Sequence, residues 1–251
     1  MNRLHATKDF WLAALRADSP ALQDAVAQAG PDAPLPSGTG TVADLVERVT
    51  AFLRFVRDYT PRGVTTRPEE LPPGPRPDWE TQLDGLRREL TGTIETLDAL
   101  EADIPAWNWA PQAKTAGFWH RRTAHEISLR RWDAESAAGR PTPIETKLAA
   151  DGIGEVLDTW LPAGRRTGPT DLHGVVHLVA GDAGHEWFVR LRGMGVALLD
   201  TSTILDDDDH HARAQATGTA SDLLLVLMGR QRTDRLVVTG DPRLIAALQA
   251  G

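Results

Sequence analysis

The first part of the chain alternates between apolar helical patterns and loops rich in proline and glycine. In one segment, Leu45, Val49, Leu53 and Val56 recur at steps of three and four residues, which places them on one face of a helix. A further apolar stripe follows Asp78, a residue suited to cap a helix. The pattern predicts four long helices and a shorter fifth, over residues 5–29, 42–59, 79–97, 118–139 and 144–161.

The later part of the chain changes to a strand pattern. The runs "LHGVVHLVAG", "HEWFVRLRGMGVALLD" and "RLVVTGD" are rich in the residues that favour strands. "ASDLLLVLMG" predicts a buried helix beginning near Ser221 or Asp222, "DDDDHH" (206–211) a turn, and "DPRLIAALQA" a closing helix. We therefore expect an α+β protein, with a four-helix bundle over residues 1–165 and a small α/β domain over residues 166–251.

Composition narrows the class of protein. Of the 251 residues, 41% are hydrophobic and 25% are charged, as in ordinary soluble proteins. No apolar run approaches the roughly 20 residues of a membrane helix, and the first residues read as an amphipathic helix rather than a signal peptide. These features predict a cytoplasmic protein with no membrane partner. The chain has no cysteine, so any reactive thiol would have to come from a small molecule.

Charge excludes a further class of partner. The net charge of -8 argues against general nucleic-acid binding, which needs clustered positive charge. The basic residues are 24 arginines and three lysines, a balance typical of GC-rich genomes such as those of actinobacteria. The sequence leaves the oligomeric state open.

The stretch "FWHRRTAHEISLRRWDAE" (118–135) carries the candidate chemistry. Glu126 is followed four residues later by Arg130, which predicts a salt bridge on one helix face where a histidine would have predicted half of a metal site. His125 points about 100° away from Glu126 and is expected to pack inside the protein. His120 is expected to face the surface or a loop.

This stretch belongs to a wider resemblance. Together with "TVADLVERV" (41–49), "PIETKLAADGI" (143–153), "GTASDLLLVLMGR" and "VVTGD", it resembles the mycothiol-dependent maleylpyruvate isomerase family. The resemblance covers nearly the whole chain and implies a DinB-like four-helix bundle. It also implies a zinc ion, held by one histidine of the second helix and a Glu-x-x-x-His pair of the fourth, that activates the thiol of mycothiol.

The chain departs from the family pattern at two of the three zinc ligands. Where the second helix usually reads "DLVAHL", this chain has "DLVERV", so that Arg48 replaces the histidine. Arg130 replaces the second histidine, and Glu126 is the only family ligand that remains. A protonated guanidinium has no lone pair to donate to a metal. We therefore expect no zinc, and we expect Arg48 and Arg130 to lie within salt-bridge reach of Glu126.

Three interpretations of these residues remain open. They form an ion-paired plug in a former metal site, a site for a carboxylate or other anion, or part of a metal site with other ligands. Four tryptophans near the fourth helix are interpreted first as core packing and otherwise as the wall of a ligand pocket: Trp107, Trp109, Trp119 and Trp132. In the later domain, His173 and His177 share a strand face and are interpreted as structural.

The sequence therefore predicts a thiol-dependent isomerase or transferase by ancestry, acting on a small anionic or unsaturated substrate without a metal. Mycothiol remains the cofactor that the resemblance implies. The candidate catalytic residues are Glu126, Arg48 and Arg130, and the candidate substrate-binding residues are Arg48, Arg130, Trp119 and Arg230. The alternative is a non-catalytic ligand-binding or regulatory protein on the same fold.

Overall fold

The computed structural model describes residues 7–36, 38, 40–69, 74–199 and 212–250. The chain divides into two compact units, one over residues 6–142 and one that contains residues 143–251. We call them the helical unit and the sheet unit. No helix in the described part of the chain is long and apolar enough to cross a membrane.

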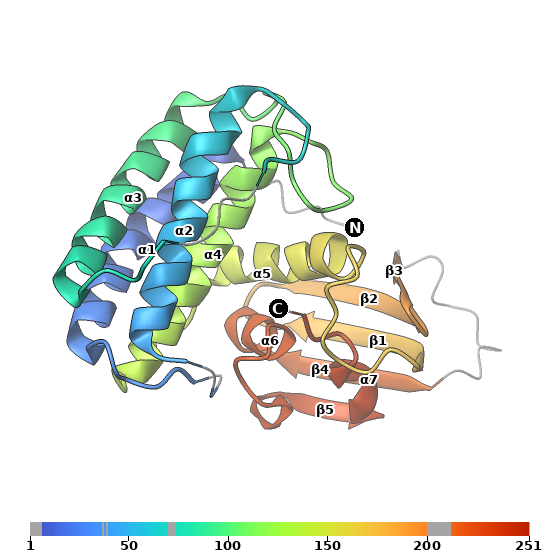
Figure 1. Ribbon diagram of the computed structural model, residues 1–251. Coiled ribbons are helices and arrows are strands. Elements are labelled where there is room, and N and C mark those ends of the chain that lie inside the picture. The colour runs from blue at the N-terminus through green and yellow to red at the C-terminus, as the bar shows by residue number, and fades with distance from the viewer. Residues whose placement is uncertain (1–6, 37, 39, 70–73, 200–211, 251) are drawn as a thin grey trace. The chain divides into compact units, whose positions relative to one another are not determined.

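The helical unit is the predicted four-helix bundle (Figure 1). Its helices are α1 (Lys8–Ala29), α2 (Val42–Tyr59), α3 (Trp79–Ala99) and α4 (Ala116–Ala137), with a short 3-10 helix, η1 (Thr60–Arg62), after α2. The side chain of Asp78 accepts a hydrogen bond from the backbone of Thr81 and caps α3, as the sequence predicted. Thr41 and Asp44 form a reciprocal capping box at the start of α2.

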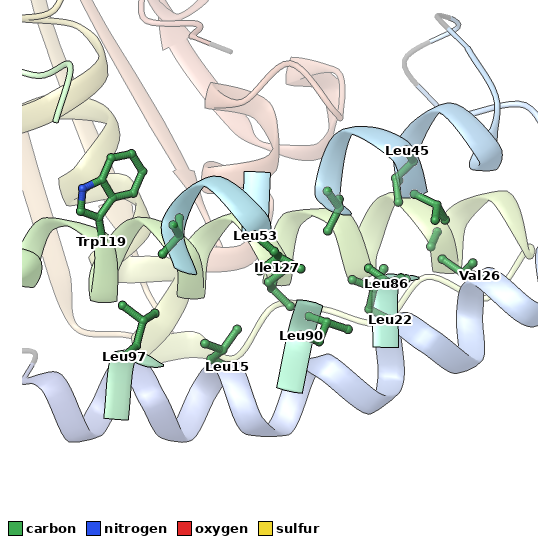
Figure 2. Packing of buried hydrophobic residues seen from close by; sticks show 14 of the residues in the cluster. Leu15, Leu22, Val26, Leu45, Leu53, Leu86, Leu90, Leu97, Trp119 and Ile127 are labelled. Atoms are coloured by element: carbon green, nitrogen blue, oxygen red, sulfur yellow. The ribbon is translucent and has the colours of Figure 1, made fainter. Parts of the chain in front are cut away.

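Large aliphatic side chains from all four helices fill the centre of the bundle (Figure 2). Leu15 and Leu22 of α1 meet Leu53 of α2, Leu90 of α3 and Ile127 of α4 in this core, and each is almost fully buried. Burying one such side chain contributes about 1.5–3 kcal/mol. This core holds α4, which carries the candidate site, against the other three helices.

The capping box makes a testable contribution to acid stability. Hydrogen bonds from Arg76 and from the backbone of Thr41 lower the pKa of Asp44 to about 2. Because the folded value lies below the ordinary value, this carboxylate stabilises the fold at neutral pH, and the contribution disappears as the pH falls from about 4 to about 2. We expect Asp44→Asn to flatten the pH dependence of unfolding in that window. Acid titration of helicity in both proteins checks this, and identical slopes would contradict it.

The sheet unit contains a five-stranded sheet with the order β3-β2-β1-β4-β5. Strands β1 and β4 pair in parallel, and all other neighbours pair antiparallel. The strands are β1 (His173–Ala180), β2 (His185–Arg192), β3 (Gly195–Leu199), β4 (Arg213–Gly218) and β5 (Val237–Gly240). The helices are α5 (Thr146–Glu155), which continues into the π-helix η2 (Val156–Trp160), α6 (Ala220–Leu227) and α7 (Pro242–Ala246), with a 3-10 helix, η4 (Thr233–Arg235), before β5.

One face of the sheet packs on α6 and α7. Val176 and Leu178 of β1 and Ala214 and Ala216 of β4 are buried on this face. Gly174 belongs to it as well, because a Cβ at this position would meet the side chain of Leu244 on α7. Side chains alternate along a strand, so the odd-numbered positions of β1 point to the opposite face.

The division between the units falls at 142/143, whereas the sequence predicted it at 165/166. The difference is the fifth helix, which packs on α6 within the sheet unit. Just before α5, the backbone N–H of Ile144 donates to the Ser221 hydroxyl at 2.9 Å. Helix α6 begins at Ala220 after the capping residue Thr219, close to the predicted start. The turn predicted over 206–211 lies outside the described residues.

Candidate functional site

Four charged side chains follow one another along α4, one helical turn apart. Arg122 Nη2 lies 2.8 Å from Glu126 Oε2, and Arg130 Nε lies 2.7 Å from Glu126 Oε1. Arg130 continues the series through Nη1, which lies 3.1 Å from Asp133 Oδ2. We call these four residues the α4 ladder. The spacing of three and four residues that brings such side chains together is inherent in the helix.

The α4 ladder is largely shielded from solvent. The Arg122 side chain is 2% exposed and that of Asp133 is 7% exposed, whereas Glu126 is 14% and Arg130 is 24% exposed. The carboxylate of Glu126 raises the pKa of Arg130, which favours the charged form of this guanidinium. Two guanidiniums face two carboxylates, and the four groups together carry no net charge.

Each carboxylate oxygen of Glu126 accepts a hydrogen bond from an arginine, and this limits its access to a metal ion. A metal ion would have to displace Arg122 or Arg130 to reach this carboxylate. Within the described ranges, no group of three or more His, Asp or Glu residues is placed to share a metal ion. Glu126, the position at which the resemblance implies a metal ligand, is thus engaged by two arginines.

Contrary to the sequence prediction, Arg48 forms no ion pair with Glu126. Its side chain is exposed on α2, and among the described residues it forms no ion pair. Arg122 occupies the place beside Glu126 that was expected for Arg48. The physical reason is local: Arg122 is one turn before Glu126 on the same helix, whereas Arg48 lies beside the buried stripe of α2 and extends into solvent.

A second buried network on α4 was not anticipated. Arg131 contacts Asp18 of α1 through Nε at 3.0 Å, and its Nη1 lies 2.8 Å from Glu135 Oε1. The backbone N–H of Thr142 donates to Glu135 at 2.8 Å. Burial raises the pKa of Asp18 above its ordinary value, although Arg131 opposes this effect. The i,i+4 spacing of Arg131 and Glu135 was visible in the sequence, but the partner on α1 was not.

The histidines of α4 are both interior residues. His125 is buried, as expected, but His120 is only 1% exposed and does not face the surface. The Nδ1 atom of His120 lies 2.8 Å from the Ala116 carbonyl oxygen, and its Nε2 atom lies 2.7 Å from that of Leu97. His120 thus connects the end of α3 to the first turns of α4. The expectation of a surface position overlooked that backbone carbonyls inside the bundle can accept a hydrogen bond from the ring N–H.

Trp119 packs in the core of the bundle. It is 3% exposed, and its indole N–H donates to the Trp107 carbonyl oxygen at 2.6 Å. The rings of Phe55 and Phe118 lie 5.4 Å and 5.0 Å from it. These contacts favour the core-packing interpretation of the tryptophan cluster over a ligand wall.

Arg230, the last candidate, lies in the sheet unit just after α6. It is partly buried, and its Nη1 donates to the Met228 carbonyl oxygen at 3.0 Å. This contact holds the guanidinium close to the end of α6. A role of Arg230 in substrate binding stays a prediction.

Comparison with known proteins finds a family match over the helical unit and a similar fold over nearly the whole chain. Residues 12–135 match the family model described as the mycothiol maleylpyruvate isomerase N-terminal domain. The structure of a mycothiol-dependent maleylpyruvate isomerase is similar to this chain, with a TM-score of 0.66 at 11% identity, over 95% of this chain and 96% of that one.

A histidine-to-alanine mutant of a mycothiol-dependent maleylpyruvate isomerase is similar to the same extent, with a TM-score of 0.65 at 11% identity and the same coverage. A search of curated proteins finds no match. The match to solved structures extends beyond the bundle into the sheet unit, in agreement with the predicted α+β fold. Residues 12–135 of the chain therefore match the N-terminal domain of the mycothiol maleylpyruvate isomerase family, and the chain shares its fold with the two solved structures.

Proposed function

We propose that this chain is a metal-independent member of its family. In this proposal it binds a small anionic or unsaturated substrate, and the zinc-centred activation of the thiol has been replaced by the α4 ladder. The observation that supports it is the double occupation of Glu126 by Arg122 and Arg130. A carboxylate whose two oxygens are engaged by guanidiniums is a poor metal ligand.

Arg130 is the residue of the ladder best placed to meet a ligand. Its Nε and Nη1 atoms are held by Glu126 and Asp133, and among the described residues its Nη2 atom makes no hydrogen bond. About a quarter of its side chain is exposed, at 24%. Glu126 and Asp133 would orient the guanidinium, and Nη2 would donate to an oxyanion of the substrate. Arg48, exposed on α2, would add positive charge without a fixed contact.

Mycothiol would supply the thiol in this proposal. The chain has no cysteine, so a nucleophilic sulfur can only arrive with a cofactor or substrate. When bound, such a thiol supplies a sulfur nucleophile able to add to an unsaturated bond. The residues of this chain would bind and orient the anionic substrate beside it.

The metal part of the proposal gives a direct prediction. We expect purified protein to contain no stoichiometric zinc, even after incubation with zinc, because the two family positions that would carry histidine carry cations. Elemental analysis by mass spectrometry measures this. About one zinc per chain, lost in Glu126→Ala, would overturn the metal-independent assignment.

A second candidate function is a non-catalytic ligand-binding or regulatory protein. The neutrality of the α4 ladder favours it, since two guanidiniums and two carboxylates already satisfy one another. Incubation of the protein with mycothiol and an unsaturated carboxylate, followed by proton NMR, separates the two candidates. Isomerised or thiol-adduct product above the protein-free rate supports the enzyme, and binding without turnover supports the second candidate.

A further inference from the structure

The sheet unit contains a cavity on the face opposite α6 and α7. Its volume is about 270 Å³. The side chains on its floor come from the odd-numbered positions of β1 and from their cross-strand partners on β2 and β4. All of the lining residues belong to the sheet unit, so the cavity is independent of the α4 ladder and of the function proposed for it.

Two arginines flank the centre of this cavity. Arg190 of β2 and Arg213 of β4 both pair in register with Val175 of β1, one from each side. Two strand spacings separate their Cα atoms by roughly 10 Å, which lets two long side chains converge over the small Val175. Arg190 is partly buried, and Arg213 is exposed and forms no ion pair within the described residues.

The neighbouring row of the sheet supplies an apolar and aromatic wall. Phe188 of β2 pairs with His177 of β1 on one side and with Leu199 of β3 on the other. The rings of His177 and Phe188 stack, with centroids 4.1 Å apart and planes 10° apart. The Nε2 atom of His177 lies 2.8 Å from Glu186 Oε2, which fixes the imidazole in this position. The wall is therefore built before any ligand arrives.

We propose that this cavity binds a small organic carboxylate. The carboxylate would lie between the guanidiniums of Arg190 and Arg213, and its apolar body would lie against Val175, Phe188 and Leu199. A bare inorganic anion would leave the apolar wall in contact with water. A neutral ligand would bring no negative charge to the two guanidiniums. Neither alternative uses both halves of the cavity.

Calorimetric titration of the full-length protein tests the ligand class. The probes are benzoate, benzyl alcohol and inorganic phosphate, each at the same ionic strength. We expect benzoate to bind about tenfold more tightly than either of the other two, because only benzoate meets both the arginines and the wall. Equal affinity for benzoate and benzyl alcohol, or no benzoate binding at all, would overturn the proposal.

Variants then locate the site. Arg213→Gln should weaken benzoate binding by about tenfold, the loss typical of one charge-assisted hydrogen bond. Arg232→Gln is the matched control, since this arginine is 89% exposed in the same unit and does not line the cavity. Arg130→Gln controls for the α4 ladder. If Arg232→Gln or Arg130→Gln loses as much binding as Arg213→Gln, the carboxylate does not bind in this cavity.

The two proposals fail in different ways. If Arg213→Gln loses benzoate binding while its zinc content and turnover stay unchanged, the result tests the cavity of the sheet unit alone. The zinc content of the wild-type protein tests only the function proposed for the α4 ladder. Because Arg213 is exposed, its replacement is expected to leave the fold intact, and circular dichroism of the variant checks this.

Discussion

Replacing Glu126 with glutamine is expected to lower the free energy of unfolding of the helical unit by about 3 kcal/mol. Glutamine keeps the shape of the side chain but removes the charge that compensates Arg122 and Arg130. Arg122 is 2% exposed, so its guanidinium cannot be resolvated without opening the bundle. Removing one carboxylate from a buried ion-paired series lowers the compensation of the guanidiniums that remain, and this is what makes the loss large. Urea unfolding followed by the helical signal measures it.

An exposed pair in the same unit provides the control. Arg87 and Asp84 form an i,i+3 pair at 2.7 Å on α3, with side chains 64% and 61% exposed. Asp84→Asn removes a carboxylate charge from the same kind of contact, but water can solvate the arginine that remains. We expect it to cost less than about 1 kcal/mol. If Glu126→Gln costs no more than Asp84→Asn, the α4 ladder contributes nothing to stability beyond an ordinary surface pair.

The bundle could be predicted because its signals are local. The apolar stripe of α2 and the cap at Asp78 each depend on residues within a few turns of one another, and both were found as predicted. The boundary between the units could not be placed in the same way. The fifth helix has an ordinary helical pattern, and only its packing on α6 and the hydrogen bond from Ile144 to Ser221 show that it belongs with the sheet.

In the candidate site, too, contacts within one helix could be predicted and contacts between helices could not. The contact between Glu126 and Arg130 followed from their spacing, and the contact with Arg122 could have been found by the same rule applied in the other direction. The contact of Arg131 with Asp18 depends on how α1 and α4 pack, which no spacing reveals.

The cavity of the sheet unit was missed for a similar reason. His177 was interpreted as structural, and its stacking on Phe188 appears only when the strand register is known. The register also brings Arg190 and Arg213 to either side of Val175, although they come from strands distant in sequence.

The double variant Arg48→His with Arg130→His is expected to gain a zinc site. It restores the two histidines that the family resemblance implies, beside the one carboxylate that remains. Three ligands of this kind are the number found in catalytic zinc sites that keep one position open. It also removes the guanidinium that occupies Glu126 Oε1. We expect about one zinc per chain in the double variant, with wild type binding none, and raised thermal stability in the presence of zinc.

The matched control is Arg48→Gln with Arg130→Gln, which removes the same two charges without adding imidazole ligands. If both double variants bind zinc equally, the metal uses other residues and the family positions are not its ligands.

If neither double variant binds zinc, either Arg122 blocks the metal or position 48 does not face Glu126. A third substitution separates these two causes. Adding Arg122→Met removes the guanidinium at Glu126 Oε2, so zinc binding only in this triple variant would show that Arg122 blocks the metal. No binding even then would show that position 48, exposed on α2, does not face Glu126. The α4 ladder would then be a structural feature of this bundle, with a geometry that no longer provides the family's metal site.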